Sequence, residues 1–146
     1  MDESIKNLKT PEECLKLANS IRDLYPELAR EAHRRAIELR AIAYGSKSEV
    51  ETELLKALFA YEDVLSEKNN RKTRASRTWQ MINRYGIIGA AEKAVNRKIE
   101  AMGYLVLSKK GMKDWTFESV IVRYPKAFRH EVVAKAKLRL EEFSKF

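Results

Sequence analysis

The chain has 146 residues and a formal net charge of +8, and 45% of its residues are hydrophobic and 34% charged. This composition favours one globular domain with an apolar core, over residues 1–146, and excludes a disordered chain. Its single cysteine, Cys14, excludes an internal disulfide framework and is expected to be a small buried apolar residue. The longest uncharged runs, such as AMGYLVLS (101–108), are far shorter than the roughly 20 apolar residues that span a bilayer. The N-terminal segment MDESIKNLKT lacks the apolar core of a signal peptide. We therefore expect a cytoplasmic protein with no membrane partner.

Two helices are predicted in the first third of the chain. Thr10 is a suitable N-cap and Pro11 suits the first helical position, so a helix is expected from there. Pro26 begins a second helix, and Gly45 is a natural C-terminal end for it. Both segments have apolar residues at helical spacing, which predicts that each packs one side against a core.

A third helix is predicted to begin at the capping box formed by Ser48 and Glu51. It continues to the pair Asn69-Asn70. A fourth helix is expected at about 74–85, ended by Gly86.

The remaining segments are shorter. A fifth helix is expected from about residue 88 or 89, with an apolar face formed by Ala91, Val95, Ile99 and Met102. YLVLSKK (104–110) is interpreted as a short helix or an extended segment. DWTFESVIVRY (114–124) is interpreted as a helix capped by Asp114 or, because of its β-branched VIV, a strand. A last helix is expected at about 129–143. The pattern predicts an all-α fold, a single-domain bundle or array of six to seven helices with short connections.

Charge is distributed unevenly along the chain. Residues 1–70 carry a net charge of −3 and residues 71–146 a net charge of +11. Such an asymmetry predicts a polyanionic partner for the second half. The alternative is that the acidic first half neutralises the basic second half.

The segment NNRKTRASRTWQ (69–80) contains four cations and no acid. On a helix over 71–85, Arg74, Arg77, Met81 and Arg84 share one sector, which we call the basic ridge, and Arg71 lies at its edge. Thr78, Trp79, Ile82 and Tyr85 fall on a separate, core-facing side. Arginine forks suit phosphate oxygens. The alternative is that the ridge pairs with upstream acids such as Glu62 and Glu67.

Two helices around Gly86 suggest a helix-turn-helix, but the register does not fit one. With Gly86 as the turn glycine, Ile82 occupies a position that favours a small residue, and Glu92 one that should be aliphatic. The standard motif is therefore not expected, although a different helical DNA or RNA binder remains open.

No motif for catalysis or for a cofactor is present. The chain has two histidines, and neither is spaced to bind zinc with Cys14. Asp63 and Glu67 share a helix face at i,i+4 and could hold a divalent metal in a nucleic-acid-processing enzyme, although a solvated acidic face is the simpler interpretation. We expect no cofactor and no resident metal, and the sequence favours a binding role over an enzymatic one without deciding between them.

The sequence therefore predicts a module that binds DNA or RNA through the phosphate backbone. A protein-interaction or homodimerisation module and a metal-dependent enzyme are the alternatives. Further basic groups near Gly111 and Pro125 would extend the contact. The predicted nucleic-acid-binding residues are Arg71, Lys72, Arg74, Arg77, Arg84, Lys109, Lys110, Arg123, Lys126 and Arg129.

Overall fold

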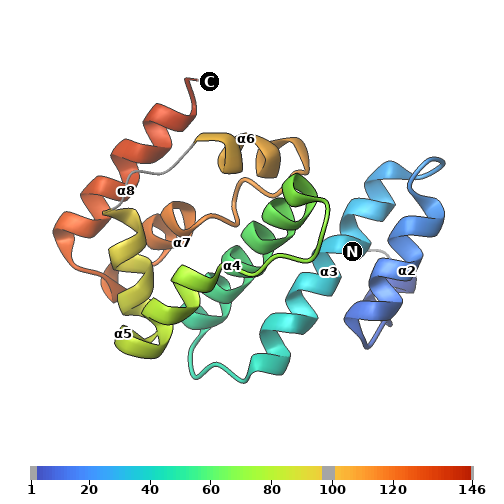
Figure 1. Ribbon diagram of the computed structural model, residues 1–146, viewed down its shortest axis with the longest axis horizontal. Coiled ribbons are helices and arrows are strands. Elements are labelled where there is room, and N and C mark those ends of the chain that lie inside the picture. The colour runs from blue at the N-terminus through green and yellow to red at the C-terminus, as the bar shows by residue number, and fades with distance from the viewer. Residues whose placement is uncertain (1–2, 97–100, 146) are drawn as a thin grey trace. The chain divides into compact units, whose positions relative to one another are not determined.

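The computed structural model describes residues 3–96 and 101–145. Within these residues the chain forms eight α-helices and one short 3-10 helix, and no strand, which confirms the predicted all-α fold (Figure 1). Two compact units can be distinguished, Met1–Ser46 and Lys47–Phe146. The expectation of one domain over the whole chain stays a prediction, and the two units are described separately.

The first unit consists of α1 (Glu3–Lys6), α2 (Pro11–Ile21) and α3 (Pro26–Tyr44). As expected, the hydroxyl of Thr10 accepts a hydrogen bond from the backbone N–H of Glu13 at 3.2 Å, and Gly45 ends α3 in the left-handed conformation. Small side chains on α2 and α3 let the two helices pack closely around Ile5 of α1. Cys14 is fully buried here, and this burial raises the pKa of its thiol, so it behaves as a packing residue.

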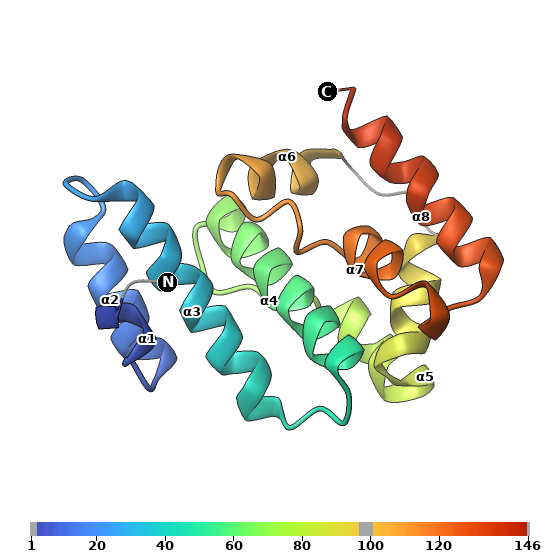
Figure 2. The ribbon, with the colours of Figure 1, turned by 180° about the vertical axis from the view of Figure 1, so that it is seen from behind.

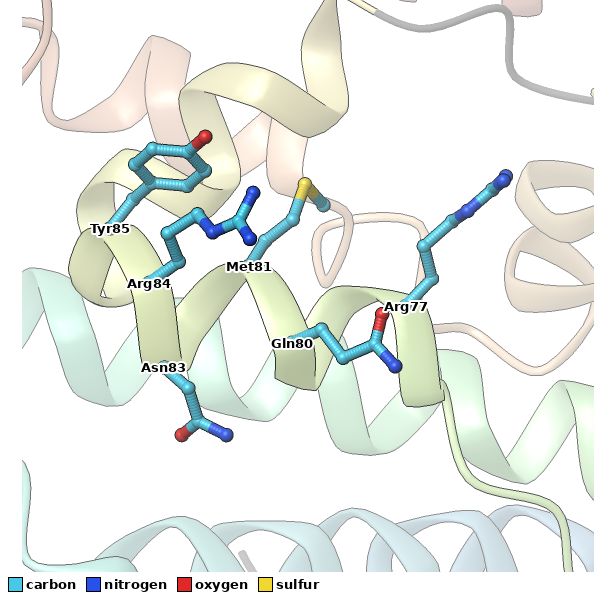
Figure 3. A pocket seen from close by; sticks show the side chains of 6 residues that line it. All are labelled: Arg77, Gln80, Met81, Asn83, Arg84 and Tyr85. Atoms are coloured by element: carbon cyan, nitrogen blue, oxygen red, sulfur yellow. The ribbon is translucent and has the colours of Figure 1, made fainter.

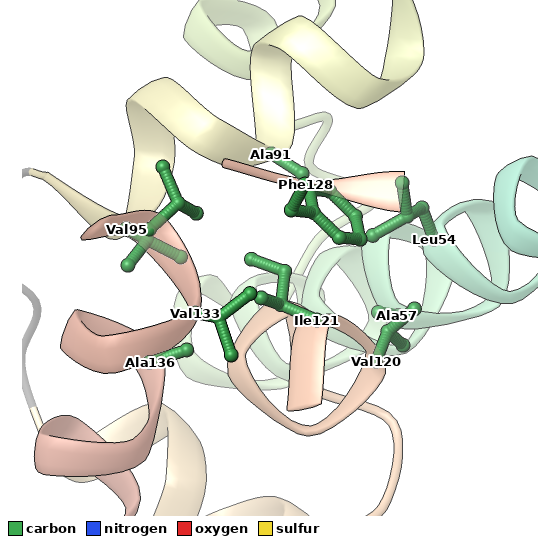
Figure 4. Packing of buried hydrophobic residues seen from close by; sticks show 10 residues of the cluster. Leu54, Ala57, Ala91, Val95, Val120, Ile121, Phe128, Val133 and Ala136 are labelled. Carbon is green, nitrogen blue, oxygen red and sulfur yellow. The ribbon is translucent and has the colours of Figure 1, made fainter. Parts of the chain in front are cut away.

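The second unit consists of α4 (Glu49–Asn69), α5 (Ser76–Val95), α6 (Ala101–Lys109), α7 (Phe117–Arg123), η1 (Pro125–Ala127) and α8 (His130–Phe143). In this unit α7 packs against both α4 and α8, as the view from behind shows (Figure 2). The main core is formed by buried apolar residues of α4, α5, α7 and α8 and of the segment just before α8 (Figure 4). Its members include Leu54, Ala57, Ala91, Val95, Val120, Ile121, Phe128, Val132, Val133 and Ala136.

Two predicted element boundaries are wrong. The segment containing VIV is helical, and α7 begins after Thr116 rather than Asp114, because the Thr116 hydroxyl accepts a hydrogen bond from the N–H of Ser119. The predicted helix at 74–85 begins at Ser76. Gly86 interrupts α5 as expected, and part of the apolar face predicted for the following helix, at residues 97–100, lies outside the described residues.

One buried ion pair lies beside this core. Nε of Arg139 is 3.0 Å from a carboxylate oxygen of Glu118, and the Arg139 guanidinium also donates to the carbonyl of Val95. Glu118 is only 3% exposed, and burial raises its pKa even though its own backbone N–H and Arg139 oppose the shift. The pair joins α7, α8 and the end of α5.

Candidate nucleic-acid interface

The connection between α4 and α5 is not helical, which corrects the helix placed over residues 71–85. Asn70 adopts a left-handed conformation and ends α4. The backbone N–H of Thr73 then donates to the Ser66 hydroxyl at 2.9 Å, which fastens the connection to the last turns of α4. Arg71, Lys72 and Arg74 therefore lie before α5 rather than on it.

Glu62 fixes where α5 begins. Its side chain is 5% exposed, and one carboxylate oxygen accepts hydrogen bonds from the N–H of Ala75 and from Nε1 of Trp79, both at 2.8 Å. Ala75, the N-cap, offers no side-chain hydrogen bond of its own, so the carboxylate of Glu62 caps α5 from α4. This negative charge also means that the N-terminus of α5 is not available to an anion.

Arg74 and Trp79 belong to the same arrangement. Nε of Arg74 lies 3.8 Å from the Glu62 carboxylate, and its guanidinium lies 4.9 Å from the centre of the Trp79 ring. Phe59 also lies near this ring, at 6.0 Å between centroids. Trp79 is half-buried in these contacts, so the structure supports packing rather than base stacking as its role.

The basic ridge thus keeps two of its four predicted members, Arg77 and Arg84. Arg74 precedes the helix, and Met81 is only 7% exposed, because the core-facing side of α5 extends further round the helix than the sequence pattern indicated. Arg77 and Arg84 are exposed, and neither forms an ion pair with any residue that the structure describes.

Arg77 and Arg84 border an open cavity of about 580 Å³ beside the first half of α5. The other described residues around it are Gln80, Met81, Asn83 and Tyr85. In the close view, the two arginines and Tyr85 project from one side of the helix, and Gln80 and Asn83 from another (Figure 3). None of the described residues that line it is acidic.

Tyr85 was predicted to face the core, and this is wrong, since 46% of its surface is exposed. Gly86 follows it with φ 81° and ψ 172°, a combination of positive φ and extended ψ that only glycine adopts readily. The helix axis turns at this residue. The turn brings Lys93 back to the Tyr85 ring, with Nζ 4.4 Å from its centroid, and the Arg84 guanidinium lies 6.0 Å away.

We call the exposed set formed by Arg77, Gln80, Asn83, Arg84, Tyr85 and Lys93 the α5 basic face. Sequence reasoning missed four of its members. Gln80 and Asn83 carry no charge, although their helical spacing with Arg77 was available as a signal. Lys93 and Tyr85 meet only through the turn at Gly86, which spacing alone does not reveal.

The turn itself is not a standard helix-turn-helix, in line with the sequence interpretation. Ile82 is buried at the position that should be small. Glu92, where an aliphatic residue was required, instead accepts a hydrogen bond from the N–H of Arg129 at 3.1 Å and caps α8. Glu92 thus has the same role at α8 that Glu62 has at α5.

Four of the ten predicted contact residues have carboxylate partners. Arg74 pairs with Glu62 and Lys110 with Glu67. Arg123 pairs with Glu53 at 3.6 Å. Arg129 pairs with Glu92 at 3.5 Å and with Glu131 at 3.6 Å. In the part of the chain that the structure describes, no ion pair involves the remaining six, Arg71, Lys72, Arg77, Arg84, Lys109 and Lys126.

The structure offers little to the metal-dependent alternative. Across residues 3–96 and 101–145, no group of three or more His, Cys, Asp or Glu side chains is placed to hold a metal ion. Glu67, one of the two proposed ligands, lies against Lys110.

No described helix is long and apolar enough to cross a membrane. Comparisons of the chain with protein-family models, with curated proteins and with solved structures found no match.

Proposed function

We propose that this protein binds nucleic acid through its phosphate backbone, and that the α5 basic face is the centre of the contact. The observation that carries the proposal is that Arg77 and Arg84 have no acidic partner among the described residues, and that no described residue lining the open cavity beside them is acidic. An ordinary solvated helix face mixes charges of both signs.

The ion pairs divide the predicted contacts into two classes. Arg71, Lys72, Arg77 and Arg84 are exposed and can bind phosphate without first leaving a carboxylate. Lys109 and Lys126 would extend the contact, because they too are exposed and form no ion pair with a described residue. A phosphate at Arg74, Lys110, Arg123 or Arg129 must instead compete with the acid already paired there, so these four contribute less to binding.

This division yields a matched experiment. Arg77→Ala/Arg84→Ala and Arg123→Ala/Arg129→Ala each remove two arginines and lower the net charge equally. Fluorescence anisotropy with labelled duplex and single-stranded oligonucleotides, over a series of salt concentrations, measures binding. For duplex DNA the first variant should flatten the slope of log K against log salt by about 1.8, that is about 0.9 for each lost phosphate contact. The second should change it much less.

Three results would contradict the proposal. The wild type could fail to bind at low salt, its affinity could be independent of salt, or the two double variants could lose affinity equally. Light scattering of the same samples at low and high salt separates nucleic-acid binding from the alternative of homodimerisation, which would show as a doubled mass that falls to the monomer at high salt.

A further inference from the structure

The outer side of the first half of α5 carries an unusual combination of side chains. Ser76, Arg77, Gln80, Asn83 and Arg84 are all exposed, and at 100° per residue they fall within about 120°, with the two amides toward one edge of this arc and the two arginines toward the other. The buried or half-buried residues, among them Met81 and Ile82, lie outside that arc. No acid and no large apolar residue interrupts it, so the arc is available to a partner along the whole of residues 76–85.

The identities of these side chains match base edges as well as phosphates. The amides of Gln80 and Asn83 carry no charge and add little to the attraction of a phosphate backbone. Asn and Gln are, however, the side chains that bond adenine bidentately in the major groove, and arginine does the same for guanine. The two amides therefore form a surface that can distinguish an A·T pair from the other base pairs.

The helix also has suitable dimensions. Ten residues make a rod about 15 Å long, which spans roughly four base pairs, and the major groove of B-form DNA, about 12 Å wide, admits an α-helix. The deep and narrow major groove of A-form RNA does not. Arg71 and Lys72 precede the arc, and Lys93 lies beyond Gly86 against Tyr85, so cations adjoin it at both ends.

We infer that residues 76–85 of α5 enter the major groove of duplex DNA, where Gln80 and Asn83 contact base edges and select a short sequence, while Arg77 and Arg84 bind phosphates as in the proposed function. This inference rests on the proposed function, and it adds a partner class and a source of specificity. The adjoining cations Arg71, Lys72 and Lys93 would hold phosphates on the walls of the groove.

The test is a selection from a pool of random duplex DNA, carried out with three proteins. These are the wild type, the variant Gln80→Ala/Asn83→Ala, and the control Asn7→Ala/Asn96→Ala, which removes two exposed amides elsewhere. Circular dichroism melts confirm that all three are folded. Anisotropy with the selected duplex, a scrambled duplex, the matching RNA duplex and a single strand then measures affinity.

The wild type and the control should enrich the same motif of about four base pairs, containing A·T pairs at the positions that Gln80 and Asn83 contact. In Gln80→Ala/Asn83→Ala, the preference for adenine over other bases at these positions should fall about 10-fold. Its affinity should fall more for the selected duplex than for the scrambled duplex, because the two amides carry no charge and the salt-dependent phosphate contacts come from the arginines and lysines.

Two outcomes would overturn the inference and leave the proposed function standing. One is salt-dependent binding with no enriched motif, or with a motif that Gln80→Ala/Asn83→Ala does not alter. The other is tighter binding to RNA or to a single strand than to duplex DNA. A wild type that binds no nucleic acid at all would overturn both.

Discussion

The carboxylate of Glu62 is expected to be the most important single polar group for the position of the α5 basic face. Glu62→Ala removes the acceptor of two hydrogen bonds, from Ala75 N–H and Trp79 Nε1–H, each 2.8 Å long. A hydrogen bond to a charged group contributes about 1.5–3 kcal/mol, and the interaction with the helix dipole adds about 0.3–1 kcal/mol. The desolvation of a carboxylate that is only 5% exposed offsets part of this sum.

We therefore expect Glu62→Ala to lower the free energy of unfolding by about 3 kcal/mol, which corresponds to a decrease in Tm of roughly 10 °C for a chain of this size. Urea denaturation followed by tryptophan fluorescence is a suitable assay, because Trp79 is itself a partner of the carboxylate. Glu141→Ala is the control, since the side chain of this exposed glutamate on α8 forms no hydrogen bond or ion pair with any described residue, and its loss should change stability by less than about 0.5 kcal/mol.

Glu62→Gln gives a further test of the mechanism. The amide keeps one acceptor oxygen but removes the negative charge from the N-terminus of α5, so an intermediate loss is expected. The reasoning is refuted if Glu62→Ala and Glu141→Ala are equally stable. In that case the buried carboxylate does not hold α5 in place, and apolar packing, including that of Trp79 against Phe59, does so instead.

Three other predictions concern binding, the turn and the buried ion pair. Arg77→Ala/Arg84→Ala should weaken nucleic-acid binding more than Arg123→Ala/Arg129→Ala in the salt series, because only the second pair has carboxylate partners. Gly86→Ala should cost about 1–3 kcal/mol in a thermal melt, purely from its backbone conformation, since no atom lies within 4 Å of the added methyl group. It should cost more than Gly45→Ala, whose left-handed conformation other residues tolerate better, and equal costs would contradict this. The raised pKa of Glu118 means that the folded state binds its proton more tightly than the unfolded state. Protonation of Glu118 therefore adds to the free energy of unfolding. This contribution is fully present below the ordinary glutamate pKa and is lost as the pH rises through the raised pKa of the folded state. Wild type should gain stability relative to Glu118→Gln as the pH is lowered through that window, and a difference that does not change with pH would refute the assignment.

Local sequence signals were sufficient for most of the helices. Thr10, Ser48 and Gly45 act at the helix ends as expected, because caps depend on a few neighbouring residues. The start of α5 is different. Its N-terminus is capped by a glutamate 13 residues upstream, so no neighbouring residue indicates where the helix begins.

The same distinction applies to the candidate interface. The sequence by itself determined an all-α chain with an excess of positive charge after residue 70, since helical periodicity and charge are properties of the chain order. Only the tertiary structure decided which cations remain available. Glu53, Glu62, Glu67 and Glu92 pair with Arg123, Arg74, Lys110 and Arg129 across different elements, whereas Arg77 and Arg84 meet no described acid. An ion pair requires atoms within about 4 Å of each other, and the fold, not the spacing along the chain, sets that distance.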